Sequence, residues 1–141
     1  MATRTWIRAA ARLIVTMVVA CATGAHAATA ISLDSEPGDY VGGGGRYTLT
    51  TADGTISATR SQYGPGVRVD YVGVGVWTLN FVGPDAAPFV PGNYEKASRA
   101  PFKAPNLPGL EVDGDFRGCN ALTGRFTVRE IEFGANDQVV K

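Results

Sequence analysis

Histidine and cysteine, on which most nucleophilic and metal chemistry in proteins depends, are scarce in this 141-residue chain. The only histidine is His26, and the two cysteines are Cys21 and Cys119. Because no histidine follows Ala27, the main part of the chain cannot form a Ser-His-Asp triad, a Cys-His pair or a His-ligated zinc site. Its single cysteine excludes a Cys-rich metal site and a Cys-x-x-Cys redox pair. We therefore predict a protein that is not an enzyme of these classes, and only carboxylate chemistry remains.

Clustered positive charge is missing too. Removing the three arginines of residues 1–27 from the thirteen basic residues leaves ten, against thirteen acidic ones. The basic residues stand singly along the rest of the chain, from Arg46 to Lys141, and the acidic ones form no block. Because nucleic-acid binding needs a basic patch or stripe, we expect no nucleic-acid partner.

A membrane-spanning segment is the third absence. The apolar run LIVTMVVACA, at residues 13–22, is shorter than the roughly 20 residues that a spanning helix needs. Three arginines precede it, and Ala25-His26-Ala27 follows with small residues at the two critical positions. This order is typical of a secretory signal peptide. We interpret residues 1–27 as a signal-peptide helix that is cleaved after Ala27, and we expect a secreted or periplasmic protein.

Cys21 leaves an alternative open. Val18-Val19-Ala20-Cys21 also resembles a bacterial lipobox, in which the cysteine is lipidated and becomes the first residue. Lipidation would anchor the domain to the cell envelope without changing its fold.

The clearest local pattern lies at residues 46–61. Apolar and polar side chains alternate over residues 46–52, Asp53-Gly54 is a typical two-residue turn, and residues 55–61 alternate again. We predict a β-hairpin with Leu49 opposite Ala58. The four glycines at residues 42–45 precede it; a phosphate-binding loop would need Gly-Lys-Ser/Thr, which is missing, so we interpret them as a flexible surface loop.

Further strands are indicated along the chain. The alternating segments are residues 31–33, 67–71, 77–81, 93–98, 110–113 and 126–133, with a β-bulge near Arg129-Glu130 and the opening of one more strand at Val139. Seven or eight short strands without helical periodicity predict an all-β fold, an antiparallel β-sandwich of Ig-like or jelly-roll-like type. We divide the chain into the signal peptide (1–27), an N-terminal segment with the glycine-rich loop (28–45) and the sandwich domain (46–141), whose last strand is incomplete.

The polar loop after residue 112 is a candidate calcium site. Asp113, Asp115 and Asn120 present the oxygen ligands that calcium prefers. The EF-hand pattern fails, since Arg117 stands at its fifth position and Gly124 where the bidentate glutamate belongs. An Asx-rich turn is the alternative, and we expect no other cofactor.

Acidic pairs and aromatic side chains suggest two further activities. Glu130 with Glu132, and Asp113 with Asp115, would each share one side of a regular strand, as a glycosidase pair requires. Secreted β-sandwiches also bind sugars through exposed aromatic side chains, here Trp77, Tyr40, Tyr63, Tyr71 and Tyr94. For Trp77 we favour a role as a core anchor.

Several motifs along the chain occur together. They are Ser35-Glu36-Pro37-Gly38-Asp39-Tyr40, Trp77-x-Leu79-x-Phe81, Pro91-Gly92-Asn93-Tyr94-x-x-Ala97-x-Arg99-x-Pro101-Phe102, Pro108-Gly109-Leu110-x-Val112-x-Gly114, Arg117-Gly118-Cys119-Asn120 and Gly124-x-Phe126-x-Val128-x-Glu130. In this order they resemble an uncharacterised family of secreted bacterial β-sandwich proteins, a resemblance that covers most of the chain after residue 27. The resemblance implies a β-sandwich fold and export from the cell, and it implies no particular activity.

The resemblance also implies a further strand after residues 126–133, with a second cysteine that would pair with Cys119. This chain ends before such a strand, so we expect a shortened member of the family. Burial of the Cys119 thiol, a Cys119-linked dimer and capping by a small thiol stay open as its fates.

These observations lead to one functional expectation with two alternatives. We predict a non-enzymatic binding or accessory module, secreted or on the cell surface, with a glycan or a surface protein as partner. A calcium-assisted carbohydrate-binding module is the alternative, and a carboxylate glycosidase comes after it.

Overall fold

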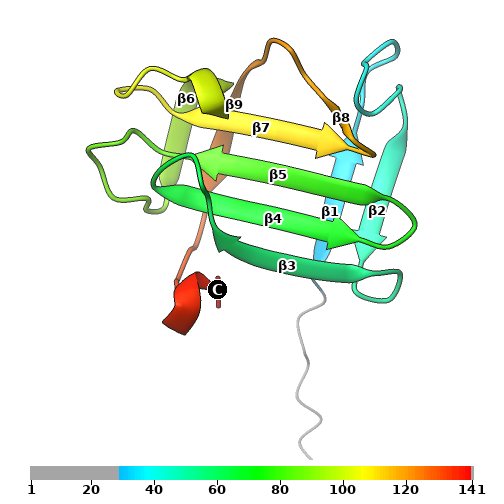
Figure 1. Cartoon of the computed structure of the whole chain (residues 1–141), viewed down its shortest axis with the longest axis horizontal. Helices are drawn as coiled ribbons and strands as arrows, with labels where there is room; N and C mark the ends of the chain where they lie inside the picture. Colours follow the sequence, from blue (N-terminus) through cyan, green and yellow to red (C-terminus); the bar gives the residue numbers. More distant parts are fainter. Residues whose placement is uncertain (1–28, 141) are drawn as a thin grey trace, which may run out of the picture.

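The computed structural model describes residues 29–140 as a mostly β fold of two sheets (Figure 1). The two-stranded sheet pairs β1 (Ala30–Asp34) with β2 (Arg46–Thr50). The seven-stranded sheet has the order β3-β4-β5-β7-β6-β9, with β8 paired to β7. Its strands are β3 (Thr55–Arg60), β4 (Gly66–Val72), β5 (Val76–Val82), β6 (Gly92–Arg99), β7 (Gly109–Gly114), β8 (Arg117–Gly118) and β9 (Thr123–Val128). Helical structure in this part of the chain is limited to the 3-10 turns η1 (Ala100–Phe102) and η2 (Ala135–Asp137).

The seven-stranded sheet is mixed, which corrects the prediction of a purely antiparallel fold. β6 runs parallel to β7, where Ser98 and Arg99 pair with Gly109 and Leu110. The parallel pairing follows from the long connection between β6 and β7, which passes through η1 and brings the chain back so that β7 runs in the same direction as β6. A tight hairpin can join only antiparallel strands, whereas a longer crossing allows this arrangement.

The two sheets pack through one apolar core. Registers between β4, β5 and β7 place Val69, Leu79 and Val112 in one row, and successive side chains of a strand point to opposite faces. This row faces β1 and β2, whose Leu49 is only 3% exposed. In Figure 1 strands β3, β4, β5 and β7 lie in front. β1 and β2 lie behind the right-hand end of these four strands, and β6 and β9, which belong to the same larger sheet, lie behind their left-hand end.

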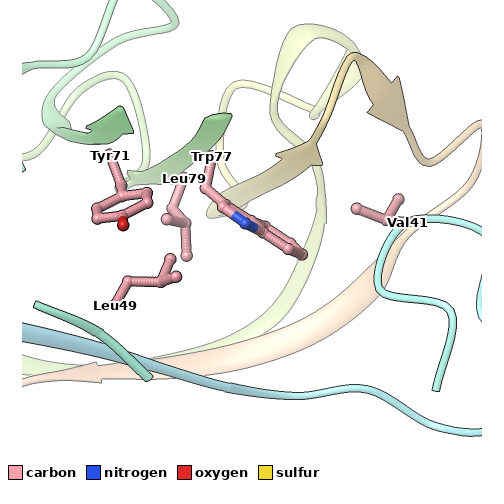
Figure 2. Packing of buried hydrophobic residues seen from close by; sticks show 5 residues of the cluster. All are labelled: Val41, Leu49, Tyr71, Trp77 and Leu79. Carbon is pink, nitrogen blue, oxygen red and sulfur yellow. The ribbon is translucent and has the colours of Figure 1, made fainter. Parts of the chain in front are cut away.

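Five buried side chains form the centre of this core: Val41, Leu49, Tyr71, Trp77 and Leu79. In Figure 2 Leu49 reaches from the two-stranded sheet toward Leu79, while Val41 faces the indole of Trp77 from the loop before β2. The core interpretation of Trp77 is confirmed, since the residue is 4% exposed.

The predicted hairpin at residues 46–61 is wrong. β2 pairs with β1, with Leu49 opposite Ile31, and β3 pairs with β4, with Ala58 opposite Val69. The turn around Asp53 carries the chain from one sheet to the other. Alternation shows which side of a strand is buried, and Leu49 and Ile56 do share the core, but they reach it from opposite layers.

Other strand predictions are confirmed. β1 and β6 form close to the predicted ranges, and β4 and β5 pair antiparallel as expected. β1, from the segment assigned to residues 28–45, pairs along its whole length with β2. Nine strands form within residues 29–140, against the seven or eight predicted.

The last predicted strand is shifted. β9 begins at Thr123 and ends at Val128, so residues 129–132 leave the sheet and no bulge forms at Arg129-Glu130. After Val128 the apolar side chains change from even-numbered to odd-numbered positions, and this change marks the end of the strand. An irregularity occurs instead in β6, between Tyr94 and Ala97, where Lys96 adopts a φ of 58°. The predicted pairing of Val139 is reduced to an isolated bridge with Phe133.

The predicted signal-peptide helix and Cys21 lie outside the described residues. Between residues 29 and 140, none of the helical segments has the length and apolar character needed to cross a bilayer.

Candidate functional site

The loop between β1 and β2 is organised by Asp39. Its carboxylate accepts hydrogen bonds from Ser35 Oγ at 2.9 Å and from the Gly42 backbone N–H at 2.6 Å. At the base of the loop, the Ser35 N–H donates to the Gly45 carbonyl at 2.9 Å. These bonds hold the pKa of Asp39 below its usual value; the Gly42 N–H contributes most, followed by the Ser35 hydroxyl.

The glycine run at residues 42–45 has all four of its N–H groups engaged within this loop. Gly42 donates to the Asp39 carboxylate and Gly43 to the Asp39 carbonyl. Gly44 donates to Ser35 Oγ at 3.2 Å, and Gly45 to the Gly42 carbonyl at 3.0 Å. Gly43 and Gly44 have φ values of 62° and 80°, which favour glycine. The run therefore offers no N–H group to an anion.

A cleft of about 370 Å³ lies beside this loop. It is lined by Leu33, Asp34, Ser35, Glu36, Asp39, Val41, Gly42, Tyr47, Trp77, Val112, Cys119 and Leu122. Tyr47 forms one wall: its ring centroid lies 4.7 Å from that of Trp77, and its hydroxyl donates to the Gly42 carbonyl at 2.7 Å. The cleft is thus bordered by the Asp39 loop, the two-stranded sheet and the segment before β9.

Cys119 lies in the wall of this cleft with a half-buried side chain, and it forms no disulfide within residues 29–140. Burial raises the pKa of its thiol, and the carboxylates of Asp39, Glu111 and Asp113 raise it further. A thiol with a raised pKa is a poor nucleophile at neutral pH. These surroundings therefore disfavour the thiolate form that a nucleophilic cysteine needs.

In the described part of the chain the three residues of the predicted calcium site are not joined to one another by hydrogen bonds. Asp113 belongs to β7, Asn120 is exposed after β8, and Asp115 lies in the turn between them with a φ of 47°. The Asp115 carboxylate accepts the Val76 N–H at 2.9 Å. Across the described residues no three His, Cys, Asp or Glu side chains are grouped to hold a metal ion. Calcium binding stays a prediction.

The proposed glycosidase pairs lose their structural basis. Glu130 and Glu132 follow the end of β9 and belong to no strand. Asp113 is on β7 while Asp115 is in the turn after it, so these two do not share the face of one regular strand.

The aromatic residues considered for sugar binding are mostly not on the surface. Trp77 and Tyr71 are buried at 4% and 0% exposure, and Tyr63 and Tyr94 are half-buried. Tyr40 alone is well exposed, at 68%. One tyrosine does not form a row onto which sugar rings could stack.

Sequence reasoning missed a polar network on the face of the larger sheet that points away from the core. Arg99 Nε donates to both carboxylate oxygens of Glu111, at 2.9 and 3.1 Å, although the Glu111 side chain is only 4% exposed. Beside it, Asn80 is 1% exposed and accepts a hydrogen bond from Ser61 Oγ at 3.0 Å. The alternation within β5 and β7 could have placed these polar side chains on one face, but not their burial beneath η1 and its flanking loop.

A second ion pair completes this face. Arg68 donates from two nitrogens to the Asp70 carboxylate, both at 2.7 Å, and Thr78 Oγ1 donates to the same carboxylate at 2.7 Å. These bonds lower the pKa of Asp70, with Arg68 as the main cause. In the described residues no buried side-chain nitrogen or oxygen atom lacks a hydrogen-bond partner, so we interpret this network as structural support for the sheet.

A wider hollow of about 640 Å³ lies at the other end of the core. The core face of β4 and β5, at Val67 and Phe81, forms its floor, and Phe126 with the segment up to Ile131 forms one side. Its lining lacks the ordered polar loop that borders the first cleft, which is therefore the candidate site.

Comparison with protein-family models, with curated proteins and with solved structures finds no match to this chain. The functional argument therefore depends on the geometry of the cleft.

Proposed function

We propose that the protein is a non-enzymatic binding module, secreted or held at the cell surface, which takes a small ligand in the cleft beside the Asp39 loop. The observation that carries this proposal is the cleft itself, about 370 Å³ in volume, in which Tyr47 and Trp77 meet the ordered loop. Ligand sites in proteins are concave and mostly apolar, with a few fixed polar groups, and their volumes begin at about 300 Å³.

Two features of the lining favour binding over catalysis. The Asp39 carboxylate is engaged by Ser35 and Gly42, and the Cys119 thiol has a raised pKa. A general base works best when its pKa lies near the operating pH, and a nucleophile needs an adjacent base or a lowered pKa. The Ser35 hydroxyl contacts the Asp39 carboxylate, but the lowered pKa of Asp39 makes that carboxylate a weak base.

Export is supported by the N-terminal sequence. Three arginines, an apolar run and Ala25-His26-Ala27 occur in the order of a secretory signal, with a lipid anchor at Cys21 as the alternative. Two sheets sharing one core agree with a sandwich of Ig-like or jelly-roll-like type, as the family resemblance implies.

A fragment screen by ligand-observed NMR tests the binding function. We expect fragments that bind the full chain to lose binding when Leu122→Trp adds bulk to the lining of the cleft. The matched control is Val90→Trp, which places the same bulk at a side chain that is 48% exposed and outside the cleft. Fragment binding that is equal in both variants would contradict the proposal, as would the absence of any hit.

A further inference from the structure

The lining of the cleft divides into an apolar floor and an acidic rim. The apolar side chains are Leu33, Val41, Tyr47, Trp77, Val112 and Leu122. The charged side chains are the carboxylates of Asp34, Glu36 and Asp39, and none of the described residues that line the cleft is Lys, Arg or His. A lining with one sign of charge selects ligands of the other sign.

One basic residue offsets part of this charge. Arg46 pairs with Asp34 at 3.0 Å, so the negative charge of the rim comes mainly from Glu36 and Asp39. Glu36 is exposed, and its side chain has no hydrogen bond or ion pair with any residue that the structure describes. Asp39 stays ionised at neutral pH, because its pKa lies below the usual value.

The same loop disfavours an anionic ligand. Backbone N–H groups at glycine-rich turns are the usual protein donors to phosphate and carboxylate. Here each N–H group of residues 42–45 already donates to Asp39, Ser35 or Gly42. An anion in the cleft would meet three carboxylates and no free donor from this run.

We propose that the cleft binds a small organic cation, in which an apolar body carries a protonated amine. This inference rests on the proposed binding function and names its ligand class. The apolar body packs against Trp77, Val112 and Leu122, and the amine lies at the rim beside Glu36 and Asp39. Aromatic walls add to the selectivity, because the faces of Trp and Tyr attract cations.

The electrostatic surroundings of Cys119 agree with this ligand class. Its thiol lies in the cleft wall, and burial is the main cause of its raised pKa, followed by the carboxylates of Asp39, Glu111 and Asp113. Burial disfavours a charge of either sign, whereas the carboxylates favour a positive charge near the thiol over a negative one. The cleft volume of about 370 Å³ suits a small molecule, since drug-sized ligands occupy sites that begin at about this size.

Three probes with the same body test the ligand class: 4-phenylbutylamine, 4-phenylbutanol and 4-phenylbutyrate. Their dissociation constants for the full chain are measured by calorimetry and by two-dimensional NMR at low salt. We expect the amine to bind about tenfold more tightly than the alcohol, and the carboxylate to bind most weakly. Raising the salt concentration from about 0.05 to about 0.5 M should weaken the binding of the amine and leave the affinities of the other two probes less changed.

Glu36→Gln provides the decisive variant. The Glu36 side chain is exposed and contacts no other side chain through a hydrogen bond or ion pair. Loss of its charge should therefore weaken the affinity for the amine about threefold to tenfold and leave the affinity for the alcohol unchanged. The matched control is Glu95→Gln, an exposed carboxylate on β6 outside the cleft, which should change neither affinity.

The outcomes separate the two proposals. Equal affinities for all three probes, or preference for the carboxylate, would overturn the cation inference and leave the binding function standing. Binding of none of them at about 10 mM, with no fragment hit, would overturn both. A tenfold preference that Glu36→Gln does not reduce would also overturn the inference, because the selectivity would then arise elsewhere.

Discussion

The ring of Tyr47, on the two-stranded sheet, lies 4.7 Å from the ring of Trp77 on the seven-stranded sheet, with the ring planes tilted by 57°. The contact spans the two layers at the wall of the cleft. Because the Tyr47 hydroxyl also donates to the Gly42 carbonyl at 2.7 Å, one side chain links both sheets to the Asp39 loop.

Tyr47→Phe should remove the hydrogen bond and keep the ring contact. We expect a loss of about 1 kcal/mol in the free energy of unfolding, measured by urea denaturation. Tyr47→Leu should cost about 0.5–1.5 kcal/mol more, because the aromatic pair is lost as well. Tyr40→Phe, in the same loop but 68% exposed, is the control and should change the free energy of unfolding by less than about 0.5 kcal/mol. Equal losses at positions 40 and 47 would contradict the assignment.

Trp77 depends on a glycine in the neighbouring strand. Gly114 pairs with Trp77, and a Cβ atom at position 114 would lie 2.6 Å from the indole ring. Gly114→Ala should therefore displace the indole and destabilise the fold by about 1–3 kcal/mol. A change in the near-ultraviolet circular dichroism of the aromatic residues should accompany it. Gly92→Ala is the control, since its Cβ would meet nothing within 4 Å; a similar loss there would point to strand propensity instead.

Local patterns predicted which residues form strands more successfully than which strands pair. Leu49 and Ile56 alternate correctly around Asp53-Gly54, yet they belong to different sheets. The pairing of β2 with β1 depends on the loop at residues 35–45, whose path is determined by the Asp39 hydrogen bonds. Such bonds join residues three or four positions apart in a glycine-rich segment without periodicity, so pattern matching does not detect them.

The cleft could not be predicted for a similar reason. Its lining combines Glu36 and Asp39 from the first loop, Trp77 from β5 and Leu122 from the segment before β9. Each residue alone has an ordinary explanation as a turn, core or loop residue. The sequence draws attention to Cys119 as the one cysteine after residue 27, but the neighbours that affect its pKa, such as Asp39 and Glu111, come from distant parts of the chain.

The buried carboxylate of Glu111 should need Arg99. Arg99→Ala would leave a charge that is only 4% exposed without its partner. Because Arg99 itself is 28% exposed and water can enter, we expect a loss of about 2–4 kcal/mol in the free energy of unfolding. The double variant Arg99→Met with Glu111→Leu should be more stable than Arg99→Ala alone. If it is equally unstable, the loss reflects packing around Arg99 and not the unpaired carboxylate.

The Asp39 loop should make stability depend on acid pH. Because the folded-state pKa of Asp39 is lowered, the stabilisation is present above the unfolded value near 3.8 and is lost as the pH falls through the lower folded value. Asp39→Asn should therefore flatten the stability profile below about pH 5, measured by urea denaturation at each pH. Asp53→Asn, in the exposed turn before β3, is the control, because its carboxylate lies outside the Asp39 loop. A wild-type slope in the Asp39 variant would contradict the assignment.

The chemical reactivity of Cys119 should report the charge of the cleft without any bound ligand. In a Cys21→Ser background Cys119 is the only thiol of the chain. Burial and the nearby carboxylates raise its pKa, so methanethiosulfonates should modify it more slowly at neutral pH than they modify free cysteine. Between two such reagents, the one with a trimethylammonium group should react about tenfold faster than the one with a sulfonate group, after correction for their rates with a small thiol. High salt should reduce this ratio. A ratio of one, or faster reaction with the sulfonate, would show that the carboxylates do not determine the potential at the thiol, and the cation preference of the cleft would lose its electrostatic basis.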